Sequence, residues 1–226
     1  MELIIAEGSR FVKGNFGMDK KGACWIFGAG ECGGVHGRPG PEDFVIAADG
    51  GLLVCRGLGI EPDLAAGDFD SLGLEPRDVP TVRVPVAKDE TDMLLCVRLA
   101  IERGYRRLYL YGGAGGRLDH TVANLQTLLY AARLGAAAYL FDADFVYTAL
   151  IDGRLTISGP EGGIFSVFCL GAPAEGVCER GSLYTLDNAR LDCGFPLGVS
   201  NHFLDGPVEV SVRRGELLIG WQPAFS

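Results

Sequence analysis

The strongest constraint on the fold of this chain is a series of short apolar runs, each closed by Gly or Asp. Two longer segments, residues 91–103 and 118–134, lie between these runs and repeat their apolar residues at helical spacing. Buried strands that alternate with helices are typical of a parallel α/β sheet. We expect the strands at residues 23–27, 43–49, 64–68, 81–86, 107–112 and 137–143.

The pattern changes after about residue 145, where no long helical segment follows. Short β-type runs such as RLTIS, GIFSVFCL, PVEVSV and ELLIGW are separated there by Gly and Pro, which predicts a small all-β domain. The 226 residues suffice for two domains that each bury a core. We therefore expect an α/β domain over residues 1–148 and a β domain over residues 149–226.

The net charge of −9 argues against a nucleic-acid partner, because phosphate backbones are held by Lys and Arg and no basic stripe is present. An anionic ligand would need a metal ion, a few basic side chains and backbone N–H groups. The seven cysteines are an odd number without a C-x-x-C pair, which fits reduced thiols. With no export signal and no run of 18 apolar residues, we expect a cytoplasmic protein without a membrane partner.

Acidic residues follow several of the expected strands, at the sheet edge where ligands of open α/β sheets gather. They are Asp49, Asp68, Asp70, Asp89, Asp92 and Asp119. In an extended segment Asp68 and Asp70 project to the same side and could share one cation, while Phe69 anchors the turn in the core. Mg²⁺ suits such a site, because it takes one or two carboxylates together with substrate phosphates.

The alternative is that these aspartates are turn and cap residues, a common use of Asp. As a set they are harder to explain in that way. Carboxylates gathered at one sheet edge repel one another unless a cation or a basic side chain compensates.

A glycine-rich segment, GGAGG at 112–116, precedes Arg117 and the second expected helix. Glycine lets the backbone approach a phosphate closely, and a helix N-terminus favours negative charge. Arg117 and Lys88 are therefore candidate phosphate clamps. A flexible turn with basic residues on the surface is the other interpretation.

Gly28, Gly30 and Gly33 form a literal G-x-G-x-x-G after the first expected strand. A dinucleotide-binding turn requires a helix to open at once, and the residues that follow, GVHGRPGP, cannot form an ordinary helix. This argues against a dinucleotide site. The segment remains a candidate loop over the site.

Six motifs occur in a characteristic order: AADGG at 47–51, PDLAAGDFDS at 62–71, KDETD at 88–92, GGRLDHTVANL at 115–125, GSLYTL at 181–186 and SN at 200–201. In this order they resemble the thiamine pyrophosphokinase family, over about residues 43–202. The specific part is GDFDS, then a helix led by Thr-Asp, then G-R-x-D-H. Residues 1–42 match poorly, so the role of the glycine-rich segment 28–40 stays open.

The resemblance implies a Rossmann-like three-layer catalytic domain with a parallel sheet, then a β-sandwich, in a homodimer whose active sites lie between subunits. It implies that Mg²⁺ and the ATP phosphates are held by Asp68, Asp70 and Asp92, with Asp49 at the same site. Nucleotide or phosphate contacts would come from Lys88, Thr91, Arg117 and Asp119. Thiamine would be bound by Tyr184, Ser200 and Asn201.

The residue types agree with this at Tyr184, because an aromatic face suits a flat, cationic heteroaromatic ligand. A tyrosine in the core is the alternative. Some family members carry Trp at this position, which leaves stacking possible.

The implied reaction transfers the diphosphoryl group of MgATP to the hydroxyl of thiamine and releases AMP. Asp68, Asp70, Asp92 and Arg117 would be the catalytic residues, and no general base can be assigned among the aspartates. Two other classes remain open. One is a dinucleotide-dependent oxidoreductase that uses Gly28 to Gly33, and the other is a nucleotide- or thiamine-binding module without catalysis.

Overall fold

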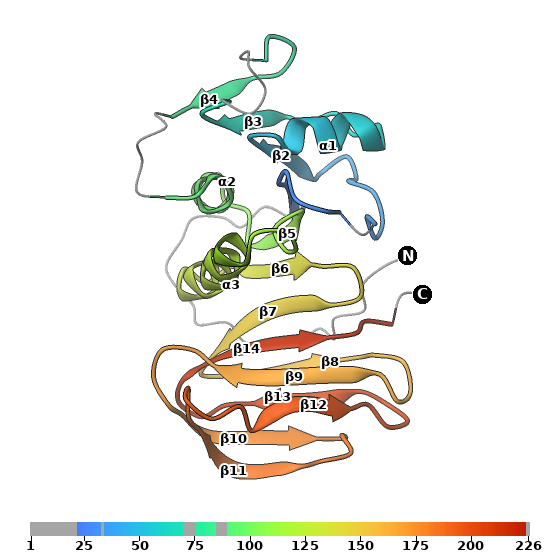
Figure 1. Cartoon of the computed structure of the whole chain (residues 1–226), viewed down its shortest axis with the longest axis vertical. Coiled ribbons are helices and arrows are strands. Elements are labelled where there is room, and N and C mark those ends of the chain that lie inside the picture. Colours follow the sequence, from blue (N-terminus) through green and yellow to red (C-terminus); the bar gives the residue numbers. More distant parts are fainter. Residues whose placement is uncertain (1–21, 33, 70–75, 85–89, 225–226) are drawn as a thin grey trace. The chain divides into compact units, whose positions relative to one another are not determined.

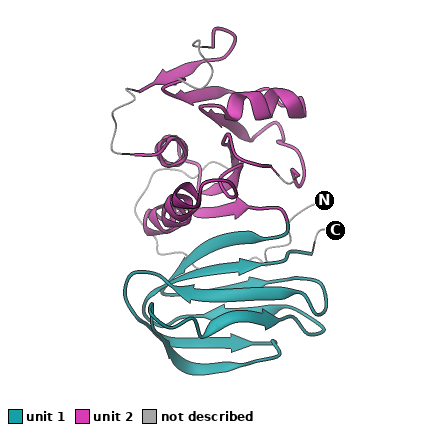
Figure 2. Ribbon diagram, in the orientation of Figure 1, with its two compact units in different colours: residues 1–14, 144–226 teal, residues 15–143 magenta. Residues whose placement is uncertain are grey.

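The computed structural model describes residues 22–32, 34–69, 76–84 and 90–224 (Figure 1). These residues divide into two compact units, one ending at Ala143 and the other beginning at Asp144 (Figure 2). The first is the α/β unit and the second is the β unit.

The α/β unit is built on a sheet with the strand order β6-β5-β1-β2-β3-β4, in which every pairing is parallel. The strands are β1 (Cys24–Phe27), β2 (Phe44–Ala48), β3 (Leu64–Gly67), β4 (Thr81–Arg83), β5 (Arg107–Tyr111) and β6 (Ala137–Phe141). Nearly every residue of β1, β2 and β3 is buried. This explains why their sequences are continuous apolar runs rather than alternating ones.

The described part of this unit has three helices, α1 (Gly51–Leu58), α2 (Asp92–Glu102) and α3 (Leu118–Arg133). α2 and α3 pack against each other, and α1 and α2 pack against the sheet. No helix follows β1 in the described residues before β2, so the G-x-G-x-x-G there does not open a helix. None of the helices in the described ranges is long and apolar enough to span a membrane.

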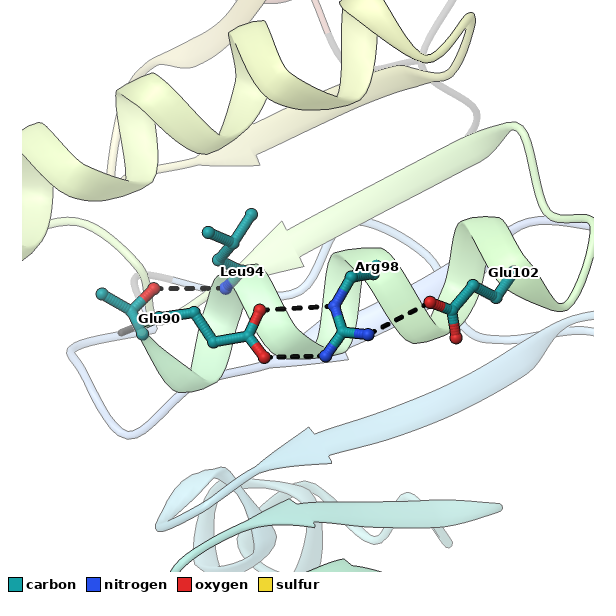
Figure 3. A network of polar contacts seen from close by, with 5 residues as sticks. Glu90, Leu94, Arg98 and Glu102 are labelled. Atoms are coloured by element: carbon teal, nitrogen blue, oxygen red, sulfur yellow. Dashed lines mark hydrogen bonds and ion pairs between the residues drawn. The ribbon is translucent and has the colours of Figure 1, made fainter. Parts of the chain in front are cut away.

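The N-terminus of α2 is fixed by a cap and by an ion-pair network (Figure 3). The Thr91 hydroxyl accepts a hydrogen bond from Leu94 N at 3.2 Å. Arg98 pairs with Glu90 through Nη2 at 2.7 Å and Nε at 3.3 Å, and with Glu102 through Nη1 at 3.1 Å. Bidentate pairing fixes geometry as well as adding attraction. Since Glu90 directly precedes Thr91, the network holds the backbone that leads into α2.

Helix α1 starts directly against the end of β1. A Cβ on Gly51 would lie 1.8 Å from the backbone oxygen of Phe27, so only glycine fits there. Gly57 in the same helix is different, because a Cβ there would have nothing within 4 Å. This helix is not expected from the sequence, since it is short and carries two glycines, which have poor helix propensity.

The β unit contains two sheets with the strand orders β12-β9-β14-β7 and β11-β10-β13-β8, and the pairings within each are antiparallel. The strands are β7 (Val146–Ile151), β8 (Arg154–Ile157), β9 (Ile164–Cys169), β10 (Ala174–Arg180), β11 (Leu186–Leu191), β12 (Gly198–His202), β13 (Val208–Ser211) and β14 (Glu216–Trp221). The chain is thus a mixed α/β protein with a multi-stranded sheet and a second, antiparallel sheet.

Candidate active site

The carboxyl ends of β1 and β5 are joined by close backbone contacts. Gly28 N donates to Tyr111 O at 2.8 Å, and Gly30 N donates to Gly112 O at 3.0 Å. A Cβ on Gly28 would lie 2.8 Å from Gly112 O, and one on Gly112 would lie 2.6 Å from Gly28 O. The glycines therefore allow two loops to meet where side chains would keep them apart.

Asp49 and Asp68 lie at the ends of the neighbouring strands β2 and β3. Asp49 N donates to Ala66 O at 2.9 Å, and a Cβ on Gly67 would lie only 3.0 Å from Asp49 Cβ. Asp49 has a φ of 46°, in the left-handed region that is uncommon for residues other than glycine. The sheet thus places these two carboxylates at one edge.

The segment after β3 differs from the extended geometry expected for residues 68–70. β3 ends at Gly67, and Phe69 has a φ of 59°, so the backbone turns before Asp70. The backbone is therefore not extended at Phe69, and whether Asp68 and Asp70 project to the same side stays a prediction. The prediction that Phe69 anchors the turn is confirmed, because its side chain is buried. Asp70, together with Lys88 from the next motif, lies outside the described residues.

The first turn of α2 lies at the same edge. A Cβ on Gly28 would lie 3.0 Å from Met93 Cε, and one on Gly113 would lie 3.3 Å from that atom. Helix α2 therefore begins close to these strand ends, with Thr91 as its cap and Asp92 as its first residue. Asp92 in the first turn also interacts favourably with the helix dipole.

The described residues do not gather three His, Cys, Asp or Glu side chains closely enough to hold a metal ion by themselves. Mg²⁺ rarely needs such a cage, because it keeps several waters and binds one or two carboxylates plus phosphate oxygens. Asp68 and Asp92 supply carboxylates of this kind. The donor chemistry at this edge therefore fits Mg²⁺ bound together with a phosphorylated ligand.

Arg117 and Asp119, at the N-terminus of α3, pair with each other. Arg117 Nη2 lies 2.6 Å from Asp119 Oδ2, and its Nε donates to Oδ1 at 3.2 Å. The hydrogen bond from Arg117 lowers the pKa of Asp119, and the same bond raises the pKa of Arg117. Both side chains are exposed, so solvent screens the pair and the Arg117 guanidinium is accessible from outside.

Asn124 connects α3 to the glycine-rich segment. This side chain is buried, and its Nδ2 donates to Gly113 O at 2.6 Å. A buried amide that satisfies a loop carbonyl restricts how far the loop can move. Asn124 is not among the site residues expected from the sequence, although a polar side chain on the buried face of an expected helix is a usable signal.

In the β unit, Tyr184 lies in the turn between β10 and β11 with its side chain in solvent, so the alternative of a core tyrosine is excluded. Its backbone is held by Asn201, whose Oδ1 accepts from Tyr184 N at 3.1 Å and whose Nδ2 donates to Tyr184 O at 2.6 Å. Ser182 Oγ also donates to Tyr184 O, at 2.9 Å. The ring is thus exposed on a firmly held turn.

Ser200 lies in a bulge of β12. Gly198 pairs with Val167 and Asn201 with Phe165, so β12 has one more residue than β9 over this stretch. Ser200 has a φ of 59°, and its backbone N donates to Ser166 Oγ at 3.1 Å. Bulges of this kind redirect side chains and are frequent beside functional sites. Ser200, Asn201 and the Tyr184 turn are therefore brought together on the β unit.

The α/β unit has the construction of a nucleotide-binding α/β enzyme, with acidic strand ends, a glycine-rich turn and helix N-termini at one sheet edge. Two family models match the chain. Residues 41–140 match "Thiamin pyrophosphokinase, catalytic domain", and residues 154–217 match "Thiamin pyrophosphokinase, vitamin B1 binding domain". The chain belongs to the thiamin pyrophosphokinase family.

Individual relatives agree with this assignment. The thiamine pyrophosphokinase of Bacillus subtilis (strain 168) is 27% identical over 181 residues, which cover 77% of this chain and 85% of that protein. The crystal structure of the Bacillus subtilis enzyme has a TM-score of 0.77 at 23% identity and covers 88% of this chain and 98% of its own. That of Geobacillus thermodenitrificans thiamin pyrophosphokinase has a TM-score of 0.76 at 24% identity, with coverages of 90% and 99%. At such identities the structural likeness concerns the fold.

Proposed function

We propose that this chain transfers the diphosphoryl group of ATP to the hydroxyl of thiamine, giving thiamine diphosphate and AMP. The observation that carries the proposal is the sheet edge where Asp49 and Asp68 follow neighbouring strands and where helix α2, which begins at Asp92, approaches a glycine-rich turn. Family membership over both units supports the same reaction. The thiamine hydroxyl attacks the β-phosphorus, the bond between the α- and β-phosphates breaks, and the hydroxyl proton is released.

The chain's own residues contribute positioning and charge. Arg117, on its exposed turn, binds phosphate oxygens, while the N–H groups of the segment 112–116 and of α3 favour negative charge. Lys88 and Thr91 contact the nucleotide, and Asp119 holds Arg117 when no nucleotide is bound. Bound Mg²⁺, held by Asp68, Asp70 and Asp92, would supply neutralisation of the charge on the transferring phosphates.

In the β unit we assign thiamine to the surface formed by Tyr184, Ser200 and Asn201. The exposed Tyr184 ring offers a face for the flat cationic ligand. Asn201 contributes through the turn that it holds rather than by direct contact, because its amide is fully engaged within the protein. A Rossmann-like layering of the α/β unit, a sandwich packing of the two β sheets and domain limits of 1–148 and 149–226 belong to the same proposal.

We also propose a cytoplasmic homodimer with the active sites between subunits. Apolar side chains that a monomer would leave in water support association: Leu183, Tyr184, Phe195, Leu197, Val199 and Leu204 are exposed on the β unit. Mixing Asp68→Asn with Tyr184→Ala protein tests the shared site. At a low thiamine concentration both variants should be impaired. Activity that rises on mixing above the sum of the separate activities supports the shared site, and activity that stays at that sum contradicts it.

The decisive experiment follows AMP and thiamine diphosphate by chromatography after incubation with ATP, Mg²⁺ and thiamine. The proposal expects equal amounts of both products and loss of both with EDTA. Thiamine binding without AMP release would replace it with the binding-module hypothesis. Tight binding of NAD(H) without ATP dependence would point instead to an oxidoreductase. That class is disfavoured because the described residues between β1 and β2 contain no helix.

A further inference from the structure

Glu179 is a buried carboxylate on β10 that the proposed reaction does not use. It is 1% exposed, on the inward face of a strand, where apolar residues such as Val177 are normal. Its Oε2 accepts a hydrogen bond from Asn201 Nδ2 at 2.7 Å. Its Oε1 is buried without a hydrogen-bond partner among the described residues. Burial raises the pKa of Glu179, with the Asn201 bond opposing that rise.

This arrangement is expensive for a merely structural residue. A buried carboxylate oxygen without a partner loses its hydration with no compensation, and a glutamine or an apolar side chain would avoid the charge. The position beside Asn201 suggests why an acceptor is kept here. A buried side-chain amide needs acceptors for its two N–H groups and donors for the two lone pairs of its oxygen. Glu179 accepts from one of the two N–H groups of Asn201.

The amide of Asn201 has all its partners inside the protein. Oδ1 accepts from Tyr184 N at 3.1 Å and from His202 N at 2.8 Å. Nδ2 donates to Tyr184 O at 2.6 Å and to Glu179 Oε2 at 2.7 Å. If the amide were rotated by half a turn, its Nδ2 would face the N–H donors of Tyr184 and His202, and its oxygen would face the Glu179 carboxylate. Both arrangements are repulsive. The acceptor at Glu179 therefore helps to lock the orientation in which Asn201 clamps both backbone groups of Tyr184.

We infer that Glu179 is a positioning residue for the thiamine site, acting through Asn201 to hold the turn that presents the Tyr184 ring. The inference rests on the proposed function. Stacking depends on the angle and distance between the ring and the ligand. A loosened turn therefore weakens the binding of thiamine and leaves the binding of the ATP phosphates unchanged. Glu179 touches no substrate and acts only by fixing Asn201.

Two variants test whether the acceptor or merely the bulk of Glu179 matters. Glu179→Met keeps length and removes the acceptor, whereas Glu179→Gln keeps an oxygen for Asn201 Nδ2. We expect Glu179→Met to raise the KM for thiamine about ten-fold, with the KM for ATP unchanged, and Glu179→Gln to stay within about three-fold of wild type. In a Tyr184→Ala background Glu179→Met should have no further effect on the KM for thiamine.

Hydrogen–deuterium exchange gives a readout that does not depend on catalysis. A peptide spanning residues 181–186 should exchange faster in Glu179→Met, whereas a peptide from α3 should not change. If Glu179→Met does not fold, Asn201→Ser serves instead, because its short side chain cannot reach both Glu179 and Tyr184 and should give the same selective increase in the KM for thiamine.

The outcomes separate this inference from the proposed function. Wild-type protein that forms no thiamine diphosphate would overturn both. An active wild type with an unchanged KM for thiamine in Glu179→Met would overturn the inference alone. An equal increase in the KM for thiamine in Glu179→Gln and Glu179→Met would also overturn it, since the charge rather than the acceptor would then matter. Additive effects of Glu179→Met and Tyr184→Ala on this KM would overturn it too.

Discussion

Asn124→Ala tests whether the glycine-rich turn is held in place from α3. The substitution removes the 2.6 Å bond from Nδ2 to Gly113 O and leaves a carbonyl of the buried Gly113 short of a partner. Leaving a buried acceptor unsatisfied costs about 1–3 kcal/mol. We therefore expect the free energy of unfolding of the α/β unit to fall by about that amount. The KM for ATP should also rise several-fold, because Arg117 follows the loosened turn.

The assay is urea denaturation followed by circular dichroism at the helix band, since all helices of the described residues lie in the α/β unit. Thr127→Val is the matched control. Thr127 is also buried on α3, and its hydroxyl donates to Ala123 O at 2.9 Å. The Ala123 carbonyl keeps its backbone hydrogen bond within the helix when this hydroxyl is removed. We expect the control to lose less than about 1 kcal/mol. Equal destabilisation by the two variants, with an unchanged KM for ATP, would refute the reasoning.

The remaining predictions concern the acidic edge, the thiamine site and the buried carboxylate. Asp68→Asn should lower turnover at least about 100-fold while thermal stability stays near wild type, as measured by AMP release and melting temperature; near-normal turnover would remove Asp68 from the metal site. Tyr184→Ala should raise the KM for thiamine about ten-fold and Tyr184→Trp should not, and equal KM values in all three proteins would exclude stacking. Glu179 has a folded pKa raised above its ordinary 4.5, so its protonated form stabilises the fold at low pH and this contribution is lost as the pH rises above about 4.5. Glu179→Gln should therefore flatten the decline in the stability of the β unit as the pH rises above about 4.5. Trp221 fluorescence in denaturant, measured in a Trp25→Phe background so that only the β unit reports, checks this, and an unchanged slope would contradict the pKa shift.

The parallel sheet and its two long helices were predictable, because the spacing of apolar residues in the sequence matches the positions that these elements bury. α2 and α3 were expected at 91–103 and 118–134 and lie at Asp92–Glu102 and Leu118–Arg133. α1 was missed because it is short and carries Gly51 and Gly57, which have poor helix propensity. The close contact with β1 that requires glycine at position 51 is not visible in the sequence. In the β unit, β10 to β12 were missed, since polar residues on exposed faces hide the apolar alternation.

The candidate site was predictable as a set of residue types, but its geometry was not. The order of motifs pointed to Asp49, Asp68 and Asp92, and the parallel pairing of β2 and β3 puts Asp49 and Asp68 at the ends of neighbouring strands. Asp92 is instead the first residue of helix α2. The turn at Phe69 could not be read from the sequence, because a positive φ at a bulky residue runs against local preference. Glu179 was invisible for another reason: its partner Asn201 is 22 residues away along the chain.

The two glycines of α1 limit how this protein could be made more heat-resistant. Replacing a helical glycine with alanine usually stabilises a helix by about 0.5–1 kcal/mol, and Gly57 has room for the methyl group. The same replacement at Gly51 would push a carbon into the Phe27 carbonyl and displace the end of β1. An engineering rule based on residue type alone would thus improve one end of this eight-residue helix and damage the end of β1 at the other.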